Sequence, residues 1–524
     1  MAVGSRPRED SLGTIADAVF EQVRRVLPPD SDCEITLDRS LHEIGLDSLT
    51  RMDALNRLEE AFGMRFSEDS LYDMQTCRDV VEYIEANAAG GLPRPSVKAS
   101  AAPTTPALAD PPAVLGFRHP QGDVTQFPEC LAFRERLAGA AAAGLENPFF
   151  RCKDRVDKAT ATIAGREVVS YTSFDYLGLA GHPRVIAAAK EALDRFGASA
   201  SASRLVGGNH AIVQQLDEEI ARFLGTEAAI VFPSGYGTNA SVFGNLFGVE
   251  DVILYDELAH NSIVQGACLS KAQRRPFPHN DFRSLDRMLR DIRGKYRRAV
   301  VAIEGVYSMD GDYPDLPRFI EVKRRHRALL YVDEAHSIGV MGLTGRGLCE
   351  HFGADPGDGD LWMGTISKAL GSGGGYLAGR EILIQYLKYT TPAFVFATAI
   401  SPANAAAALE AVRVVREEPE RPARLRERSR LFLKLAADCG LDTGNSCDTP
   451  VIPIILGDSR RCIQVVAQLL REGIDAQPIL YPAVPESKAR IRFFVTAEHT
   501  EEQICRTVQA LADCIAASQN AIPD

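Results

Sequence analysis

The chain has 524 residues, which is too long for one small core and fits two or three domains. Its hydrophobic fraction of 45% is ordinary for a soluble globular protein. It has no apolar run near the roughly 18 residues that span a membrane, and its polar first ten residues do not resemble a secretory signal. The eleven cysteines form no CxxC pair, which argues against a metal site and favours free thiols in a cytoplasmic protein.

The net charge of −12 is concentrated near the N-terminus. Residues 1–90 hold 9 Arg, no Lys and 19 Asp or Glu, a net charge of −10, whereas the remaining 434 residues carry only −2. An acidic surface attracts basic protein partners and repels nucleic acid. We therefore expect an acidic module attached to a nearly neutral body that binds no nucleic acid.

Residues 9–88 are predicted to form an all-α bundle of four helices. Apolar residues recur at helical spacing over 11–27, and a second helix is predicted to begin at Ser48 with an apolar stripe that ends at Phe62. A short segment near 67–74 and a helix over 77–87 complete this module. Residues 89–114 are rich in Ala, Pro and Gly, a composition typical of a semi-extended linker.

From about residue 115 short β-rich runs alternate with segments of helical length. This alternation predicts an α/β domain with a mostly parallel sheet and helices on both faces. A long helical stretch after Ser401 leads to a small α+β domain with strands near 451–455 and 490–495. The strands predicted for the large sheet are 229–233, 252–256, 299–304, 329–333 and 375–378.

Residues 45–49, Gly-Leu-Asp-Ser-Leu, place a serine where the second helix is predicted to start. Asp47 and Ser48 could simply cap that helix. The motif, however, resembles the phosphopantetheine attachment site of acyl carrier proteins, and the resemblance covers residues 9–88. It implies a 4′-phosphopantetheine arm on Ser48, attached by a phosphopantetheinyl transferase and charged by an acyl-loading enzyme. Asp53, Glu59 and Glu60 follow on the same helix and are expected to steer docking to a partner.

Several blocks further along carry residues suited to chemistry. They include Asp-Glu-Leu-Ala-His-Asn-Ser at 256–262, Tyr-Val-Asp-Glu-Ala-His-Ser at 331–337 and Gly-Thr-Ile-Ser-Lys at 364–368. Together these blocks resemble the α-oxoamine synthases, a fold-type-I family that depends on pyridoxal phosphate and includes serine palmitoyltransferase, 5-aminolevulinate synthase, 2-amino-3-ketobutyrate ligase and 8-amino-7-oxononanoate synthase. The resemblance covers residues 115–520 and implies a large cofactor domain over about 165–400 and a small domain over about 401–520.

The resemblance implies a role for each matching residue around the cofactor ring. Lys368 is expected to form the Schiff base and to act as the general base, which requires a lysine that spends time neutral. Asp333 is expected to pair with the pyridine nitrogen, although a strand-end aspartate could also cap a helix. His336 is expected to bond the phenolate oxygen, and His260 to stack on the ring, although an isolated histidine is more often structural.

Other matching residues are expected around the phosphate and the substrate. Thr398 matches a position that reaches the phosphate of a neighbouring subunit, which implies a homodimer. The residues expected near the cofactor phosphate or close to the cofactor are Ser234, Gly235, Tyr236, Glu304, Ser308, Thr365 and Ser367.

The carboxylate of an amino acid needs a bidentate cation, a role that suits arginine. Arg492 is the better match to the family's carboxylate-binding stretch, with Arg490 in reserve, and either could instead be a surface residue of an edge strand. Asp175 lies in a block that resembles the family's substrate mouth, but its role is open because some relatives have Asn there. His210 is expected to be structural.

These residues together predict a decarboxylative condensation of serine, glycine or alanine with an acyl thioester carried on Ser48. The product is an α-aminoketone, and the fused carrier suggests polyketide or other secondary metabolism. One alternative is a biotin-pathway synthase that joins pimeloyl thioester to alanine. A second is a carrier or scaffold protein whose cofactor domain has lost activity.

Overall fold

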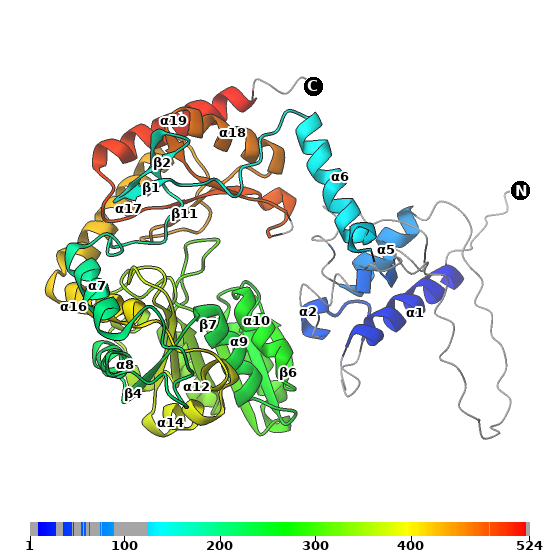
Figure 1. Cartoon of the computed structure of the whole chain (residues 1–524). Coiled ribbons are helices and arrows are strands. Elements are labelled where there is room, and N and C mark those ends of the chain that lie inside the picture. Colours follow the sequence, from blue (N-terminus) through cyan, green and yellow to red (C-terminus); the bar gives the residue numbers. More distant parts are fainter. Residues whose placement is uncertain are drawn as a thin grey trace, which may run out of the picture.

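The computed structural model describes residues 9–27, 35–44, 46, 54–55, 57–58, 62, 74, 76–87, 123–481 and 483–519. Figure 1 shows an N-terminal helical region, a large α/β body and a smaller α+β domain. Within the described residues, no helix is long and apolar enough to cross a membrane.

The N-terminal region has a core of its own. Its described helices are α1 (Glu9–Val26), α2 (Leu41–Ile44) and α5 (Cys77–Asn87), so helices are present over the predicted 11–27 and 77–87. Val19 and Val23 of α1 are buried together with Ile84 of α5, because apolar residues three or four positions apart share one helix face. Ser48, most of the predicted second helix and the linker lie outside the described residues, so the four-helix arrangement stays a prediction.

A seven-stranded sheet forms the centre of the large body, with strand order β4-β10-β9-β8-β7-β5-β6. All its strands run parallel except β10, which is antiparallel to both of its neighbours. The predicted mostly parallel sheet is therefore present. The strands are β4 (Ala228–Phe232), β5 (Asp251–Asp256), β6 (Gln273–Phe277), β7 (Arg298–Glu304), β8 (Leu329–Asp333), β9 (Leu361–Thr365) and β10 (Gly375–Gly379).

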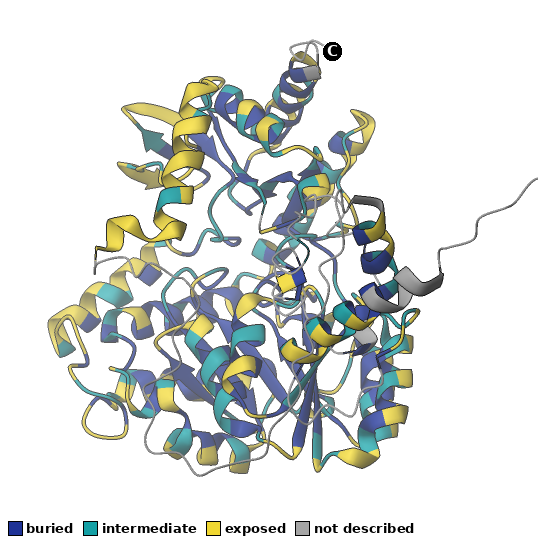
Figure 2. Cartoon of the chain, turned by 90° about the vertical axis from the view of Figure 1, so that its right-hand side faces the viewer, coloured by how far each residue is buried: buried dark blue, intermediate teal, exposed yellow. Residues whose placement is uncertain are grey.

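Helices cover both faces of this sheet, because alternate strand residues point to opposite sides. Val252 and Leu254 of β5 join one hydrophobic cluster, whereas Ile253 and Tyr255 join another. Figure 2 shows that the sheet strands between the helices are mainly buried. The first cluster includes α7 (Pro183–Phe196), α8 (Ala211–Leu224), α11 (Phe282–Ile292), α12 (Leu316–His326), α13 (Leu348–His351) and α16 (Pro402–Glu417). The second includes α9 (Gly235–Leu246), α10 (Asn261–Leu269), α14 (Glu381–Thr390) and α15 (Pro392–Val395).

The small domain is formed by segments that precede the large body in sequence and by segments that follow it. β12 pairs in parallel with β3, which precedes the large body in sequence, and a second small sheet has the order β11-β14-β13. The small domain was predicted to begin at residue 401. Buried alanines of α16, the first helix after that residue, belong to the core of the large body and not to the small domain. Its elements are β1 (Arg155–Asp157), β2 (Thr160–Ile163), β3 (Arg166–Ser170), α17 (Glu420–Asp438), β11 (Val451–Ile455), α18 (Ser459–Arg471), β12 (Ile474–Asp475), β13 (Gln477–Ile479), β14 (Arg490–Phe494) and α19 (Glu501–Gln519).

One helix lies apart from these cores. α6 (Pro128–Ala142) leads from the N-terminal region toward the small domain, and none of its residues is buried (Figure 1). The remaining short 3₁₀ turns are η1 (Val124–Gln126), η2 (Arg293–Lys295), η3 (Pro356–Asp358) and η4 (Glu486–Lys488).

Candidate active site

The carboxyl ends of the parallel strands bring the predicted site residues to one edge of the sheet. β7 ends at Glu304 and β8 at Asp333, and these two residues are direct neighbours in the strand register. β9 ends at Thr365, and Lys368 follows three residues later. Ligand sites of parallel sheets lie at this edge.

Asp333 is a buried carboxylate held by two hydrogen bonds. Its Oδ2 accepts from Asn239 Nδ2 at 2.7 Å, and its Oδ1 accepts from the backbone N–H of Ala335 at 2.9 Å. Asn239 is fixed in turn by the hydroxyl of Tyr331, which donates to Asn239 Oδ1 at 2.6 Å. The carboxylate is therefore fixed in orientation before any ligand binds.

Lys368 lies in an environment that favours a neutral amine. Desolvation, aided by the positive charge of Arg492, lowers its pKa to about 8, while Asp333 and Glu304 oppose that shift. Its Nζ lies 5.6 Å from the centre of the Phe174 ring. A lowered pKa is what a lysine nucleophile or general base needs near neutral pH.

Two histidines flank this lysine. His336 is buried, and its Nδ1 lies 2.7 Å from the Tyr176 hydroxyl. Burial, together with the charges of Lys368 and Arg492, holds the pKa of His336 well below its usual range, so the ring is neutral.

His260 is exposed, and its Nδ1 lies 2.7 Å from Ser262 Oγ. Partial desolvation lowers the pKa of His260, and Lys368 and Arg492 act in the same direction against Asp333. Its backbone N–H donates to Glu304, a buried carboxyl whose pKa burial raises well above the usual value. The His260 backbone is thereby tied to the end of β7.

The start of α9 and the turn after β9 form a cradle of small and hydroxyl residues. Ser234 caps α9 and accepts from the Gly237 N–H at 3.2 Å. A Cβ at Gly235 would lie 2.9 Å from Thr365 Oγ1, so only glycine lets these two segments approach so closely. Ser367 Oγ accepts from the Gly374 N–H at 3.2 Å. Such a helix start suits a phosphate group.

Two other residues predicted near the phosphate are exposed. Tyr236 is 49% exposed, and its hydroxyl donates to Asn261 Oδ1 at 3.1 Å. Thr398 is also exposed, and within the described part of the chain its side chain makes no hydrogen bond. The protomer alone therefore does not join Thr398 to the cradle.

Arg490 and Arg492 point to the same side of β14 but differ in their partners. Arg490 is buried and forms an ion pair with Asp310 at 2.7 Å. Arg492 donates to the Ser308 carbonyl at 2.8 Å, and its Nε is buried with no hydrogen-bond partner. Arg492 therefore keeps donor capacity for a ligand, whereas Arg490 has a structural partner.

Asp175 and His210 hold local structure. Asp175 accepts from the backbone N–H groups of Leu179 at 2.8 Å and Ala180 at 3.0 Å, and desolvation raises its pKa to about 6. His210 precedes α8, and its ring stacks on Phe196 with ring centres 5.3 Å apart. The structural role expected for His210 agrees with this contact.

The sequence did not single out Asn239, Tyr176 or Ser262, although each bonds a predicted site residue. Asn239 lies 94 positions from Asp333, and Tyr176 lies 160 positions from His336. Only the fold brings these pairs together. Tyr176 could have been suspected from its place beside Asp175 in the substrate-mouth block.

Comparison with known families agrees with this geometry. The model of the aminotransferase class I and II family matches residues 166–511, and the model of the phosphopantetheine attachment site matches residues 17–84. The chain therefore belongs to the aminotransferase class I and II family and carries a phosphopantetheine attachment domain at its N-terminal end.

Its relatives narrow the group to the α-oxoamine synthases. The chain is 42% identical over 378 residues to 8-amino-7-oxononanoate synthase of Symbiobacterium thermophilum, covering 72% of this chain and 96% of the relative. It is 40% identical to 8-amino-7-oxononanoate synthase 1 of Bacillus subtilis over 67% of this chain and 89% of that protein. The solved serine palmitoyltransferase of Sphingomonas wittichii superposes with a TM-score of 0.72 at 31% identity, covering 76% of this chain and all of that one.

Proposed function

We propose that this chain, with pyridoxal phosphate bound, condenses an amino acid with an acyl thioester carried on its own Ser48. The reaction forms a carbon–carbon bond, breaks the thioester C–S bond and releases CO₂, leaving an α-aminoketone. The observation that carries the proposal is Lys368, whose pKa is lowered to about 8 close to the buried carboxylate Asp333, in a chain that also has a phosphopantetheine attachment domain. Serine, glycine and alanine are the candidate amino acids, and secondary metabolism is the candidate setting.

The donor set fits pyridoxal phosphate. The amine of Lys368 suits the aldehyde carbon, and Asp333 suits a protonated pyridine nitrogen. The neutral His336 suits the phenolate oxygen, His260 the face of the ring, and the cradle at the start of α9 the phosphate. A related structure is that of a serine palmitoyltransferase determined with pyridoxal phosphate, at 29% identity and a TM-score of 0.72. When bound, this cofactor supplies an electron sink for a carbanion at the amino acid's Cα.

The residues of the chain then bind the amino acid and move its proton. Arg492 is proposed to hold the substrate carboxylate through its free Nε and remaining donors. Lys368 accepts the proton from Cα as general base, which its lowered pKa favours. The Asn239 hydrogen bond keeps the Asp333 carboxylate in place during this transfer.

The fused carrier supplies the acyl group at high local concentration. A tether makes the encounter of acyl group and active site intramolecular and requires no new contact. A phosphopantetheinyl transferase and an acyl-loading enzyme are the partners that the carrier needs. Free acyl-CoA is then a poorer substrate than the group on Ser48.

A homodimer completes the site in this proposal. Thr398 is exposed two residues after Phe396, which is 84% exposed, and α14 carries Ile382 at 80% and Tyr389 at 70% exposure. Large apolar side chains that are this exposed favour an interaction site. We propose that a second copy covers this surface and that Thr398 reaches the partner's phosphate cradle.

A second candidate is a biotin-pathway synthase, favoured by the relatives named 8-amino-7-oxononanoate synthase at 40–42% identity. This alternative uses the same Lys368, Asp333 and Arg492. It differs only in joining pimeloyl thioester to alanine.

The test uses the full chain purified with pyridoxal phosphate. Borohydride reduction and peptide mapping should place the cofactor on Lys368. Pimeloyl, octanoyl and palmitoyl groups are then loaded on Ser48 and offered glycine, alanine and serine, with product mass and labelled CO₂ as readouts. Release of an α-aminoketone with CO₂ supports condensation, and turnover of only the pimeloyl–alanine pair selects the biotin alternative. Absence of cofactor binding would support an inactive scaffold.

A further inference from the structure

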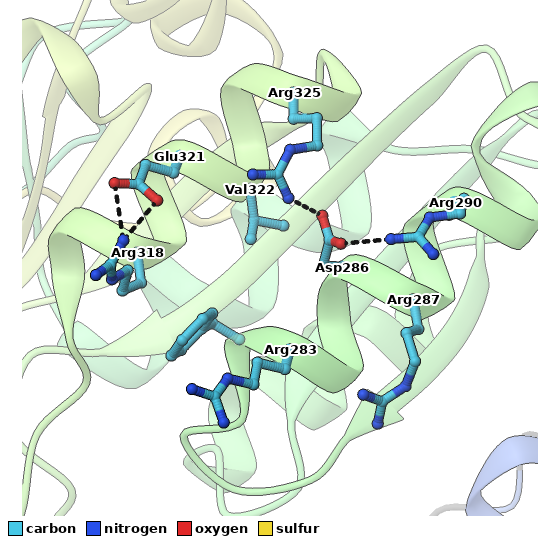
Figure 3. Close-up of a pocket in the computed structure, with 9 residues that line it drawn as sticks. Arg283, Asp286, Arg287, Arg290, Arg318, Glu321, Val322 and Arg325 are labelled. Atoms are coloured by element: carbon cyan, nitrogen blue, oxygen red, sulfur yellow. Dashed lines mark hydrogen bonds and ion pairs between the residues drawn. The ribbon is translucent and has the colours of Figure 1, made fainter.

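The outer surface of the large body carries a group of arginines that the catalytic site does not use. Five exposed arginines and two carboxylates line a cavity of about 370 Å³ between α11 and α12 (Figure 3), a net positive charge of three. We call this surface the arginine face. Its charged residues are Arg283, Asp286, Arg287, Arg290, Arg318, Glu321 and Arg325.

The two carboxylates do not neutralise the arginine face. Asp286 forms ion pairs with Arg290 at 2.9 Å and with Arg325 at 2.5 Å, and Glu321 forms an ion pair with Arg318. In the part of the chain that the structure describes, Arg283 and Arg287 have no carboxylate within ion-pair distance, although Arg287 donates to Ser284 Oγ at 2.7 Å and contributes to the lowered pKa of Asp281. Figure 3 shows both near the cavity without a paired oxygen from another labelled residue. Like charges this close repel each other, so the face favours an anionic partner.

One end of the arginine face is connected to the mouth of the active site. Asp281 caps α11 just after His279, whose Nε2 lies 2.8 Å from Asp312 Oδ2. Asp312 lies in the loop between β7 and α12, and in the same loop Asp310 pairs with Arg490 and the Ser308 carbonyl accepts from Arg492. A partner bound at the start of α11 is therefore one loop away from the proposed carboxylate site.

The acidic N-terminal module lies on this side of the body. α2 packs against β6, the edge strand that leads into α11 (Figure 1). Residues 1–90 carry a net charge of −10, and Asp53, Glu59 and Glu60 follow Ser48 in the sequence. Residues 88–122, which join the module to the body, can span at most about 115 Å, so their length does not prevent the module from reaching the arginine face.

We propose that the arginine face is the docking surface for this chain's own carrier module. The inference rests on the proposed function, because docking there serves to present the arm of Ser48 to the site. Arg283 and Arg287, which form no ion pair within the described residues, supply the positive charge that meets Asp53, Glu59 and Glu60, the acidic residues that follow Ser48 in the sequence. Complementary charge speeds encounter and fixes orientation more than it adds affinity.

Zero-length cross-linking in the full chain tests the contact without any substrate. The variant Arg283→Lys/Arg287→Lys keeps the charge and adds amines that carbodiimide couples to carboxylates. Arg460→Lys is the matched control, because Arg460 is an exposed arginine on α18 of the small domain. We expect peptides from residues 9–88 to be joined to positions 283 and 287 and not to 460, with a yield that falls as salt rises to 0.5 M. Equal yields at both sites, or none with the carrier, would overturn the proposal.

Single-turnover kinetics test the consequence. Arg283→Glu/Arg287→Glu should slow transfer from acyl-loaded Ser48 about 10-fold, while Arg460→Glu leaves it unchanged. A free N-acetylcysteamine thioester of the same acyl group, which lacks phosphates and a carrier, should react equally in both. Slowing with acyl-CoA alone would show that the face binds the nucleotide and contradict carrier docking. If wild-type protein transfers nothing from Ser48, the proposed function fails, and cross-linking still decides whether the carrier docks.

Discussion

The carboxyl groups at the ends of β7 and β8 and the side chains of the arginine face lie in opposite environments and act differently. Asp333 and Glu304 are 3% exposed, whereas Arg318 and Arg290 are 52% and 67% exposed. In the first region desolvation is the largest influence, and it lowers the pKa of Lys368 to about 8 although Asp333 and Glu304 oppose that shift. In the second, water and salt screen each pair, and the summed charge matters more than any single contact.

The buried site is therefore suited to chemistry, and the exposed arginine face is suited to docking. A single substitution at the buried site should change the reaction by orders of magnitude. A single substitution on the arginine face should change little, and only reversal of two charges should have a measurable effect.

Lys368→Ala tests the buried site most severely. Loss of the general base alone should lower turnover about 10³-fold, and loss of cofactor attachment should lower it further. The side chain is not part of the core, so circular dichroism and melting temperature should stay near wild type. Normal turnover by the folded variant would disprove the assignment.

Asp333→Asn should lower turnover about 10²-fold, the usual loss when one preorganised charge is removed. The amide keeps the size of the side chain but not its anion. A change in the absorbance of bound cofactor should accompany the loss. An Asn239→Ala variant is the matched control, since it should cause a smaller loss through misplacement of the same carboxylate.

The neighbouring arginines of β14 should separate binding from stability. Arg492→Ala should lower kcat/KM for the amino acid about 10- to 100-fold through KM, with little change in unfolding. Arg490→Ala leaves Asp310 unpaired and should cost roughly 3 kcal/mol of unfolding free energy. Denaturant titration and steady-state kinetics of both variants check this, and the reverse pattern would assign the carboxylate to Arg490.

His279 extends the comparison to pH. Although burial opposes it, hydrogen bonds to Asp256 and Asp312 raise the pKa of His279 to about 10. A raised pKa means that the stabilisation is fully present below about pH 6.5 and is lost as pH rises through about 10. The unfolding free energy lost in His279→Asn should thus be largest below about pH 6.5 and shrink as the pH rises toward 10. A difference that grows with pH would contradict this.

Arg318→Ala should have the smallest effect. Its pair with Glu321 is exposed at both ends, so the unfolding free energy should change by less than about 1 kcal/mol. A thermal melt is sufficient to measure it. A loss of several kcal/mol would mean that the face is structural.

The sequence predicted the large sheet well where strands are apolar. β5, β7 and β8 are continuous hydrophobic runs, which is what burial on both faces requires. The pattern does not predict β6, because it is an edge strand with two arginines and a proline, or β9, because its last residues, Gly364 and Thr365, belong to the motif that contains Lys368.

The site was only partly predictable for a different reason. Motifs single out Lys368 and Asp333 as candidates, but Asn239, which holds the Asp333 carboxylate, lies far away in sequence. The sequence favoured Arg492 over Arg490 for the carboxylate but did not exclude Arg490, since residues two apart on a strand share one face. Asp310, on a different loop, distinguishes them by pairing with Arg490. Ser48 lies outside the described residues, so its role stays a prediction.

The central claim is that one chain both carries the acyl group and consumes it. Intact-mass measurement of the acyl-loaded protein, before and after each amino acid is added, tests this most directly. The account predicts that the acyl mass leaves Ser48 only with one amino acid and only when Lys368 is present. Retention of the acyl group with every amino acid, while free acyl-CoA is consumed, would contradict it.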